Sequence, residues 1–469
     1  MSRRAGHLVL GVAIAAVAGL AAHAAGLGAS AAFTAATAGL CATWWVLEPV
    51  PIPATSLIPL VAFPLTGVLP HDEVAKNYGD WIILLLLGGF ILSTAVERCG
   101  AHRRLAFGMV RLTGGSGKRL VLGFMLAAAV CSMWISNTAT TLMLLPVAIA
   151  AVKEAGDERL AVPVLLGVGY SASIGGLATP IGTPPNVIFM GIYESATSTT
   201  VTFMGATHEI GGTQITFAQW MAIGLPVVIV LLPLVWLYLT RRVRGSARPS
   251  LPELGPWSPA EKRVLIVFGV TALAWIFRAT PFGGWSGALG IEGASDTTVA
   301  MAAVVALFLI PDGKGDRLLD WDTAVKIPWG MLLLFGGGLA LASGFQASGL
   351  SAALGDALGH IAAAPLVVIT LVVCLGVTFL TEVTSNTATT TVLLPILAAA
   401  ALAAGLDPAV LMVPATLSAS CAFMLPVATA PNAAIYGSGK VPPHRMAREG
   451  FALNLLGAAV ITAIALILL

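Results

Sequence analysis

Charged side chains are scarce in this 469-residue chain. Asp, Glu, Lys and Arg together make up 10% of it, against about 25% in a soluble globular protein. So few charges cannot cover the surface of two or three water-facing domains. This scarcity excludes a cytosolic enzyme, a disordered protein and a nucleic-acid binder with a basic face. Because 57% of the residues are hydrophobic, the sequence predicts a polytopic membrane protein.

Cysteines are also few. The five are scattered, and no two have the spacing of a CxxC or other metal-ligand motif. A disulfide framework and a zinc site are therefore not expected. The motif hydroxyls described below have no His or Lys nearby that could activate them as nucleophiles, so an enzyme is not expected either.

Twenty of the 24 Lys and Arg residues fall into five clusters. They lie in 98–119, 153–159, 241–263, 314–326 and 440–448. Cytoplasmic loops of membrane proteins carry the excess of positive charge. All five clusters lie on one side only if the apolar stretch 120–152 enters the membrane and returns to the same side. The charge pattern therefore predicts a re-entrant hairpin at 120–152.

The sequence repeats itself. Three motifs of the first half recur in the second half in the same order and at nearly constant spacing. The pairs are Trp81–Gly89 with Trp329–Gly337, Ser136–Thr141 with Ser385–Thr390, and Pro180–Asn186 with Pro426–Asn432. The first copy is followed by Arg-rich sequence and the second is not, so the copies have opposite orientations. Inverted repeats that meet at the bilayer centre are typical of secondary transporters.

These patterns predict the domain organisation. Residues 1–28 form an N-terminal transmembrane helix, for which a signal peptide cleaved near Ala24 is the alternative. Residues 29–240 form the first inverted repeat, with hairpin 120–152 and broken helix 160–193. A cytoplasmic linker, 241–261, leads to the second repeat, 262–469, with hairpin 362–404 and broken helix 408–439. The protein is expected in the cell membrane, with a cytoplasmic N-terminus and an extracytoplasmic C-terminus.

The repeated motifs carry the expected chemistry. Ser, Asn and Thr are strong N-cap residues, so 136–138 and 385–387 each predict the start of a half-helix. Such an end binds anions without a basic side chain. Hydroxyl, amide and freed carbonyl oxygens are ligands for Na⁺, and Pro184, Pro185 and Pro431 remove N–H donors. The alternative is that the motifs only cap helices or join them through hydrogen bonds.

Glu382 is the one carboxylate inside a predicted membrane segment near a motif. An ionisable group in such a position is a functional candidate. Its counterpart in the first repeat is Met133, so Glu382 lies outside the symmetric site. Two roles stay open, a proton-coupling residue and a hydrogen-bonded structural acid.

The motifs resemble those of the divalent anion/sodium symporter family, the DASS or INDY-type dicarboxylate transporters. Besides the repeated motifs, the resemblance rests on Ser173–Leu177, Phe379–Glu382 and Ala422–Thr429. It implies an all-α protein with eleven transmembrane helices and two re-entrant hairpins. It also implies a homodimer held by scaffold domains, and a transport domain that moves as an elevator in the lipid bilayer.

The resemblance also implies the site residues. The first Na⁺ site would consist of Ser132, Ser136, Asn137 and Gly182. The second would consist of Thr381, Thr384, Asn386 and Ala428. The substrate carboxylates would contact Asn137, Thr138, Thr183, Asn386, Thr387 and Thr429.

Two residues depart from the family pattern, Ala430 in place of a proline and Thr183 in place of a serine. Both lie at the inferred substrate surface and leave the identity of the anion open. The preferred function is Na⁺-coupled symport of a C4-dicarboxylate (succinate, malate or fumarate) with two or more Na⁺ ions. The alternatives are Na⁺-independent dicarboxylate exchange, transport of sulfate or citrate, and an anion channel.

Overall fold

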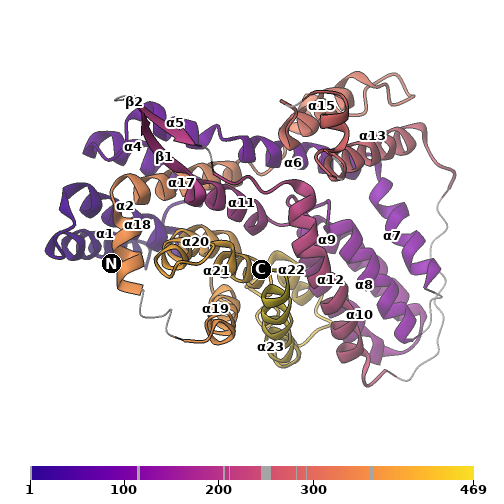
Figure 1. The fold of residues 1–469 in the computed structure, drawn as a ribbon. Helices are drawn as coiled ribbons and strands as arrows, with labels where there is room; N and C mark the ends of the chain where they lie inside the picture. Colours follow the sequence, from indigo (N-terminus) through magenta and orange to yellow (C-terminus); the bar gives the residue numbers. More distant parts are fainter. Residues whose placement is uncertain are drawn as a thin grey trace.

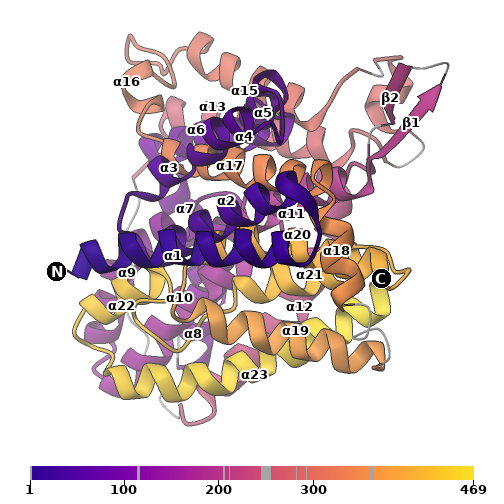
Figure 2. The same cartoon turned by 90° about the vertical axis from the view of Figure 1, so that its left-hand side faces the viewer.

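The computed structural model describes all residues except 1–2, 114–116, 204–205, 211, 244–254, 281–282, 292 and 359–363. Most of the predicted linker 241–261 and the first two residues of the predicted hairpin 362–404 therefore lie outside the described residues. The all-helical architecture is confirmed for the body of the molecule. One antiparallel hairpin adds to it, in which β1 (Thr199–Phe203) pairs with β2 (Ala206–Ile210). This hairpin projects from the helical body (Figure 2).

After α1 (Arg3–Ala24), two runs of helices follow in a similar order. The first run is α2 (Gly28–Leu47), α3 (Ile52–Thr55), α4 (Ile58–Thr66), α5 (His71–Tyr78), α6 (Trp81–Cys99), α7 (Ala101–Leu112), α8 (Lys118–Ser132), α9 (Asn137–Glu154), α10 (Ala161–Gly176), α11 (Pro184–Thr197) and α12 (Phe217–Thr240). The second is α13 (Pro259–Ile276), α14 (Gly284–Ala288), α15 (Asp296–Leu309), α16 (Trp321–Ala324), α17 (Trp329–Ala347), α18 (Leu350–Leu358), α19 (Leu366–Thr381), α20 (Asn386–Ala403), α21 (Ala409–Ala419), α22 (Ala430–Gly437) and α23 (Pro443–Leu468). A short 3₁₀ turn, η1 (Glu158–Leu160), precedes α10. The repeated motifs therefore fall on corresponding elements of the two runs.

Long apolar helices dominate the described part of the chain. Seven helical stretches in it are long and apolar enough to cross a membrane: α1, α2, α5 with α6, α12, α17, α20 and α23. Large apolar side chains on these helices, such as Leu237 and Ile467, are exposed. An exposed apolar surface of this extent is favourable in lipid and costly in water.

The helices break where the sequence predicts. Helix α8 ends at Ser132 and α9 begins at Asn137, with Ser136 as its N-cap. Helix α19 ends at Thr381 and α20 begins at Asn386, with Ser385 as its N-cap. The Ser136 and Ser385 hydroxyls accept hydrogen bonds from Ala139 N and Ala388 N, at 3.1 and 3.4 Å. The predicted N-caps of both half-helices are confirmed.

Two groups of helices lie on opposite sides of the molecule (Figures 1 and 2). The upper group contains α3 to α6, α13 and α15 to α17, and within it α6 packs against α13 and α15. The lower group contains α8, α10, α19 and α23, and within it α10 packs against α8 and α19 packs against α23. Helices α9, α11, α20 and α21 lie between the two groups in these views.

The two runs of helices exchange contacts in a reciprocal way. Helix α9 of the first run packs against α22 of the second, and α20 of the second packs against α11 of the first. Each half-helix that begins at a Ser-Asn-Thr motif therefore contacts the second part of the other run's broken helix. This exchange brings the two motif pairs to one place.

Candidate functional site

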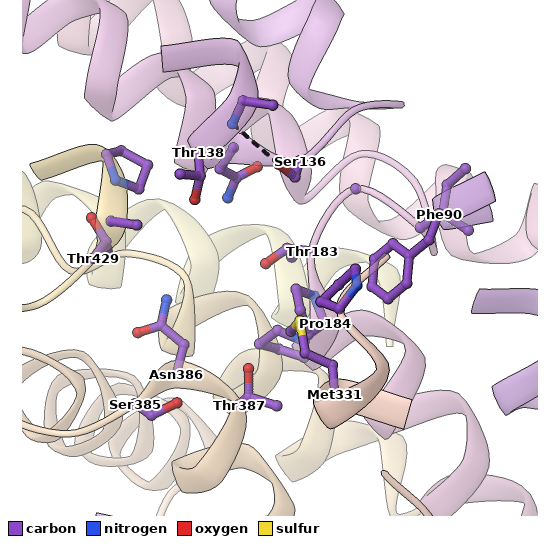
Figure 3. A pocket seen from close by; sticks show the side chains of 18 of the residues that line it. Phe90, Ser136, Thr138, Thr183, Pro184, Met331, Ser385, Asn386, Thr387 and Thr429 are labelled. Atoms are coloured by element: carbon purple, nitrogen blue, oxygen red, sulfur yellow. Dashed lines mark hydrogen bonds between the residues drawn. The ribbon is translucent and has the colours of Figure 1, made fainter. Parts of the chain in front are cut away.

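A cavity of about 620 Å³ lies where the motif pairs meet. Figure 3 shows Thr138, Thr183, Asn386, Thr387 and Thr429 around one shared space. Most of the predicted site residues line this cavity: Ser136, Asn137, Thr138, Gly182, Thr183, Thr384, Asn386, Thr387, Ala428 and Thr429. The two that do not line it are Ser132 and Thr381, which are fully buried. The structure therefore gathers residues from four separate sequence motifs.

Four helices begin at this cavity. Their first residues are Asn137 of α9, Pro184 of α11, Asn386 of α20 and Ala430 of α22, and all four line the cavity. The first N–H groups of a helix have no partner within the helix, and that end carries the positive end of the helix dipole. A carboxylate in the cavity would meet this positive potential without a basic side chain.

The Asn137 side chain is surrounded by oxygen atoms. One end of its amide lies 2.5 Å from Ser132 Oγ, 3.1 Å from the Ala172 carbonyl oxygen and 3.3 Å from the Gly182 carbonyl oxygen. With the amide nitrogen turned toward them, Asn137 donates hydrogen bonds to all three. With the amide oxygen turned toward them, the Ser132 hydroxyl donates to it, and four oxygens converge. Hard cations prefer such an all-oxygen arrangement.

The corresponding region of the second run is arranged differently. The Thr384 hydroxyl lies 2.7 Å from the Thr389 hydroxyl and donates to the Leu380 carbonyl. The Thr381 hydroxyl donates to the Thr378 carbonyl of its own helix at 3.1 Å. Asn386 Oδ1 is buried and has no hydrogen-bond partner in the described part of the chain. An oxygen in this state is available to a cation or to a donor of the substrate.

The unwound segments of the two broken helices are held at equivalent carbonyls. The Leu177 carbonyl accepts a hydrogen bond from Trp220 Nε1 at 3.0 Å, and the Phe423 carbonyl accepts one from the Tyr170 hydroxyl at 2.7 Å. A Cβ on Gly224 of α12 would lie 2.1 Å from the Leu177 oxygen. A Cβ on Gly450 of α23 would lie 2.2 Å from the Phe423 oxygen. Only glycine at these two positions permits α12 to approach the first unwound segment, and α23 the second, this closely.

Glu382 is buried and fully engaged in hydrogen bonds. Its Oε1 accepts from Met424 N at 2.8 Å and from Asn454 Nδ2 at 2.7 Å, and its Oε2 accepts from Leu425 N at 2.8 Å. Asn454 in turn accepts from Phe423 N through Oδ1. Every hydrogen-bond partner of the carboxylate is a donor. Glu382 therefore ties the tip of α19 to the unwound segment before α22 and to α23.

The two threonines before the second half-helices differ in environment. Thr183 is buried, and its hydroxyl lies 3.4 Å from the Ser420 hydroxyl, which belongs to the other broken helix. Thr429 is half-buried and caps α22 by accepting a hydrogen bond from Asn432 N at 3.2 Å. Both unwound segments line the cavity, but Thr183 is more buried there than Thr429.

One wall of the cavity comes from outside the Ser-Asn-Thr motifs and the proline-rich breaks. It includes Val46, Phe90 on α6, and Ile327, Pro328 and Met331 near the start of α17. Its charged residues, and the only charged residues lining the cavity in the described part of the chain, are Glu48, Glu97 and Lys326. Sequence reasoning missed this wall, because the repeat that contains Met331 is apolar and glycine-rich and no N-cap motif or helix break marks it as part of a binding site.

No group of three or more His, Cys, Asp or Glu side chains within the described ranges could hold a metal ion. A cation in the cavity would be bound by hydroxyl, amide and carbonyl oxygens instead. These are ligands for alkali and alkaline-earth cations rather than for transition metals.

Comparison of the sequence with known protein families and transporters assigns the chain to one family. A family model described as a citrate transporter matches residues 42–415. The chain belongs to the citrate transporter family. It is therefore a membrane transporter and not an enzyme, and the resemblance to the divalent anion/sodium symporters is confirmed.

Two named transporters are similar to this chain over most of its length. The sodium-dependent dicarboxylate transporter SdcS of Staphylococcus saprophyticus is 44% identical over 445 residues, which are 90% of this chain and 82% of that protein. The transporter of the same name from Staphylococcus aureus is 40% identical over the same shares. The crystal structure of the Alcanivorax borkumensis YdaH transporter matches with a TM-score of 0.56 over 83% of this chain and 86% of that chain. At 15% identity this likeness concerns the fold alone.

Proposed function

We propose that the protein carries a C4-dicarboxylate, such as succinate, malate or fumarate, across the cell membrane together with Na⁺. The observation that carries this proposal is the oxygen cluster at Asn137 beside helix N-termini that open on the same cavity. A cation site and an anion site then share one residue. The names of the Staphylococcus relatives support the same pair of substrates.

The proposed Na⁺ ligands come from both motif pairs. Ser132, Ser136, Asn137 and Gly182 bind the first ion. Thr381, Thr384, Asn386 and Ala428 bind the second, and the Thr381 oxygen can take part because a hydroxyl that donates to the Thr378 carbonyl keeps its lone pairs. Two or more ions are transported with each dicarboxylate.

The substrate carboxylates contact the N-terminal ends of the half-helices. Their partners are Asn137, Thr138, Thr183, Asn386, Thr387 and Thr429. No Lys or Arg belongs to these motifs, so bound Na⁺ balances the charge of the dianion. Each ligand is then costly to bind without the other. This reciprocal coupling free energy is the basis of symport.

The two runs of helices support an elevator mechanism. We assign 29–240 and 262–469 to two inverted repeats, joined by a cytoplasmic linker and preceded by a membrane helix at 1–28. Both hairpins and both broken helices form the moving body, and the wall with Phe90 and Met331 belongs to the scaffold. The N-terminus is cytoplasmic, the C-terminus is extracytoplasmic, and two copies form a homodimer through the scaffold.

The deciding experiment is uptake of radiolabelled succinate into proteoliposomes with an inward Na⁺ gradient and with K⁺ or choline in its place. We expect accumulation only with Na⁺. Equal uptake under both conditions would rule out Na⁺ coupling and favour Na⁺-independent exchange. Currents of many ions per opening would instead indicate an anion channel.

Citrate is the second candidate substrate, because the matching family model is described as a citrate transporter. A competition panel with succinate, malate, fumarate, citrate and sulfate separates the candidates. We expect the C4-dicarboxylates to compete best, since two carboxylates match two sets of helix N-termini on opposite sides of the cavity.

A further inference from the structure

The mouth of the cavity carries three charges. They belong to Glu48 just after α2, Glu97 near the end of α6, and Lys326 just before α17. The Glu97 carboxylate accepts a hydrogen bond from the Ser93 hydroxyl at 3.4 Å. Two carboxylates against one ammonium leave a net negative mouth, which repels a dianion.

Lys326 is held at this mouth by its surroundings. Arg98 at the end of α6 forms ion pairs with Asp316 at 3.5 Å and with Asp320 at 2.6 Å, both in the segment that leads to Lys326. The next residue, Ile327, is buried. The backbone at Lys326 is therefore fixed against α6, while its side chain is exposed.

The ammonium group of Lys326 forms no ion pair among the described residues, unlike the guanidinium of Arg98. The positive charge of Lys326 acts on Asp320 in this segment. The pKa of Asp320 is lowered first by hydrogen bonds from Thr323 and further by the positive charges of Arg98 and Lys326. Because Asp320 is already paired with Arg98, the charge of Lys326 remains available to an anion.

We infer that Lys326 is a specificity-determining residue that attracts the dicarboxylate into the cavity past Glu48 and Glu97. This inference rests on the proposed function, because it assumes that a dianion uses this cavity. A charge at the mouth of a cleft raises the local concentration of oppositely charged ligands and their association rate. Its effect on a dianion is larger than on a monoanion, and it falls as salt screens the charge.

The test measures succinate binding by the purified protein at fixed saturating Na⁺, with ionic strength varied by choline chloride. We compare wild type with Lys326→Gln, and with Lys326→Arg, which keeps the charge. Lys314→Gln is the matched control, because Lys314 is an exposed lysine in the same connection between α15 and α17 that does not line the cavity.

At low ionic strength we expect Lys326→Gln to raise the Kd for succinate up to about fivefold, since an exposed charge pair is worth up to about 1 kcal/mol. The difference should shrink at high ionic strength. Lys326→Arg and Lys314→Gln should bind like wild type. Adding Glu97→Gln to Lys326→Gln should restore part of the affinity, because it removes one repelling carboxylate.

Each contrary result has a distinct meaning. If wild type and Lys326→Gln show the same Kd at every ionic strength, Lys326 does not attract the anion. If the loss persists unchanged at high salt, the effect is structural and the inference fails. If wild type itself binds no succinate in the presence of Na⁺, the proposed function is overturned and this inference with it.

Discussion

Asn186 and Asn432 make the same pair of hydrogen bonds, one in each run of helices. Asn186 Nδ2 donates to the Gly176 and Thr179 carbonyls at 2.9 and 2.8 Å. Asn432 Nδ2 donates to the equivalent Ala422 and Leu425 carbonyls, both at 3.0 Å. Both side chains are fully buried. Each asparagine thus closes the unwound segment that precedes it and supplies donors where the helix has none.

Substitution of either asparagine should open its unwound segment. We expect Asn186→Ala and Asn432→Ala each to destabilise the protein by about 2 kcal/mol, because each removes two hydrogen bonds and leaves buried carbonyls unsatisfied. Transport should fall severely, since the segments position Gly182 and Ala428. Thermal unfolding and succinate uptake measure the two effects.

Asn77→Ala is the matched control for these variants. Asn77 is a half-buried asparagine outside the cavity lining, whose amide nitrogen donates to the Glu73 carbonyl of its own helix and whose Oδ1 accepts from the Ser343 hydroxyl at 3.0 Å. Its loss should cost less stability than that of the two fully buried asparagines, because its partners are at most half-buried, and should change uptake little. If Asn186→Ala and Asn432→Ala behaved like this control, the two asparagines would not stabilise the broken helices.

Loss of the Asn137 amide should abolish Na⁺ binding at the first site. In wild type, Na⁺ at about 100 times its Kd should stabilise the folded state by about 2.7 kcal/mol through mass action. Asn137→Ala should lose most of this stabilisation while staying folded. The Ser132, Ala172 and Gly182 oxygens alone would then have to bind the ion, without the Asn137 amide oxygen as the fourth ligand. Thermal shift with Na⁺ against choline measures it.

Asn386→Ala is the companion variant at the second motif, and it should also lose transport. Its buried Oδ1 has no partner in the described part of the chain, so its removal costs little stability without ligands. Wild-type uptake by both variants would contradict the assignment of the two sites.

The sequence predicts the local features of the site better than its walls. The N-caps Ser136 and Ser385 and the breaks at Pro184 and Pro431 follow from short-range propensities, which act within a few residues. The Phe90 and Lys326 wall depends on how distant helices pack, and hydrophobic periodicity does not record that packing. The Ala172 carbonyl is a backbone group, so no residue type could have marked it.

Glu382 illustrates the same limit. The sequence identifies it as a buried carboxylate but leaves its role open between proton coupling and structure. The decisive contact is with Asn454, which is 72 residues away and lies on α23. Only the folded chain brings these two side chains together, and their contact favours the structural role.

Glu382→Gln should therefore disturb the second unwound segment. A glutamine side chain offers one acceptor oxygen, and its amide nitrogen would face N–H donors such as Leu425 N. We expect a loss of about 1 to 3 kcal/mol in stability and a higher Na⁺ concentration for half-maximal uptake. A Na⁺ titration of succinate uptake at several pH values measures this. Normal Na⁺ dependence with loss of only the pH dependence would instead assign Glu382 to proton coupling.

Ala430→Pro should change two properties in opposite directions: it should raise the stability of the protein and weaken the contact of α22 with the substrate. Ala430 is the first residue of α22, where proline fits the helix. The preceding Thr429 has φ −140° and ψ 153°, which a residue before proline readily adopts. The proline should therefore raise the stability by about 0.4 to 1 kcal/mol, by restricting the unfolded chain.

The same substitution removes an N–H group at the cavity. If that group binds a carboxylate at about 1 kcal/mol, the KM for succinate should rise about fivefold, while Ala430→Ser, which keeps the N–H, should leave it unchanged. Uptake kinetics and thermal unfolding of the two variants measure both effects. An unchanged KM in Ala430→Pro, together with raised stability, would mean that the start of α22 shapes the cavity without binding the anion.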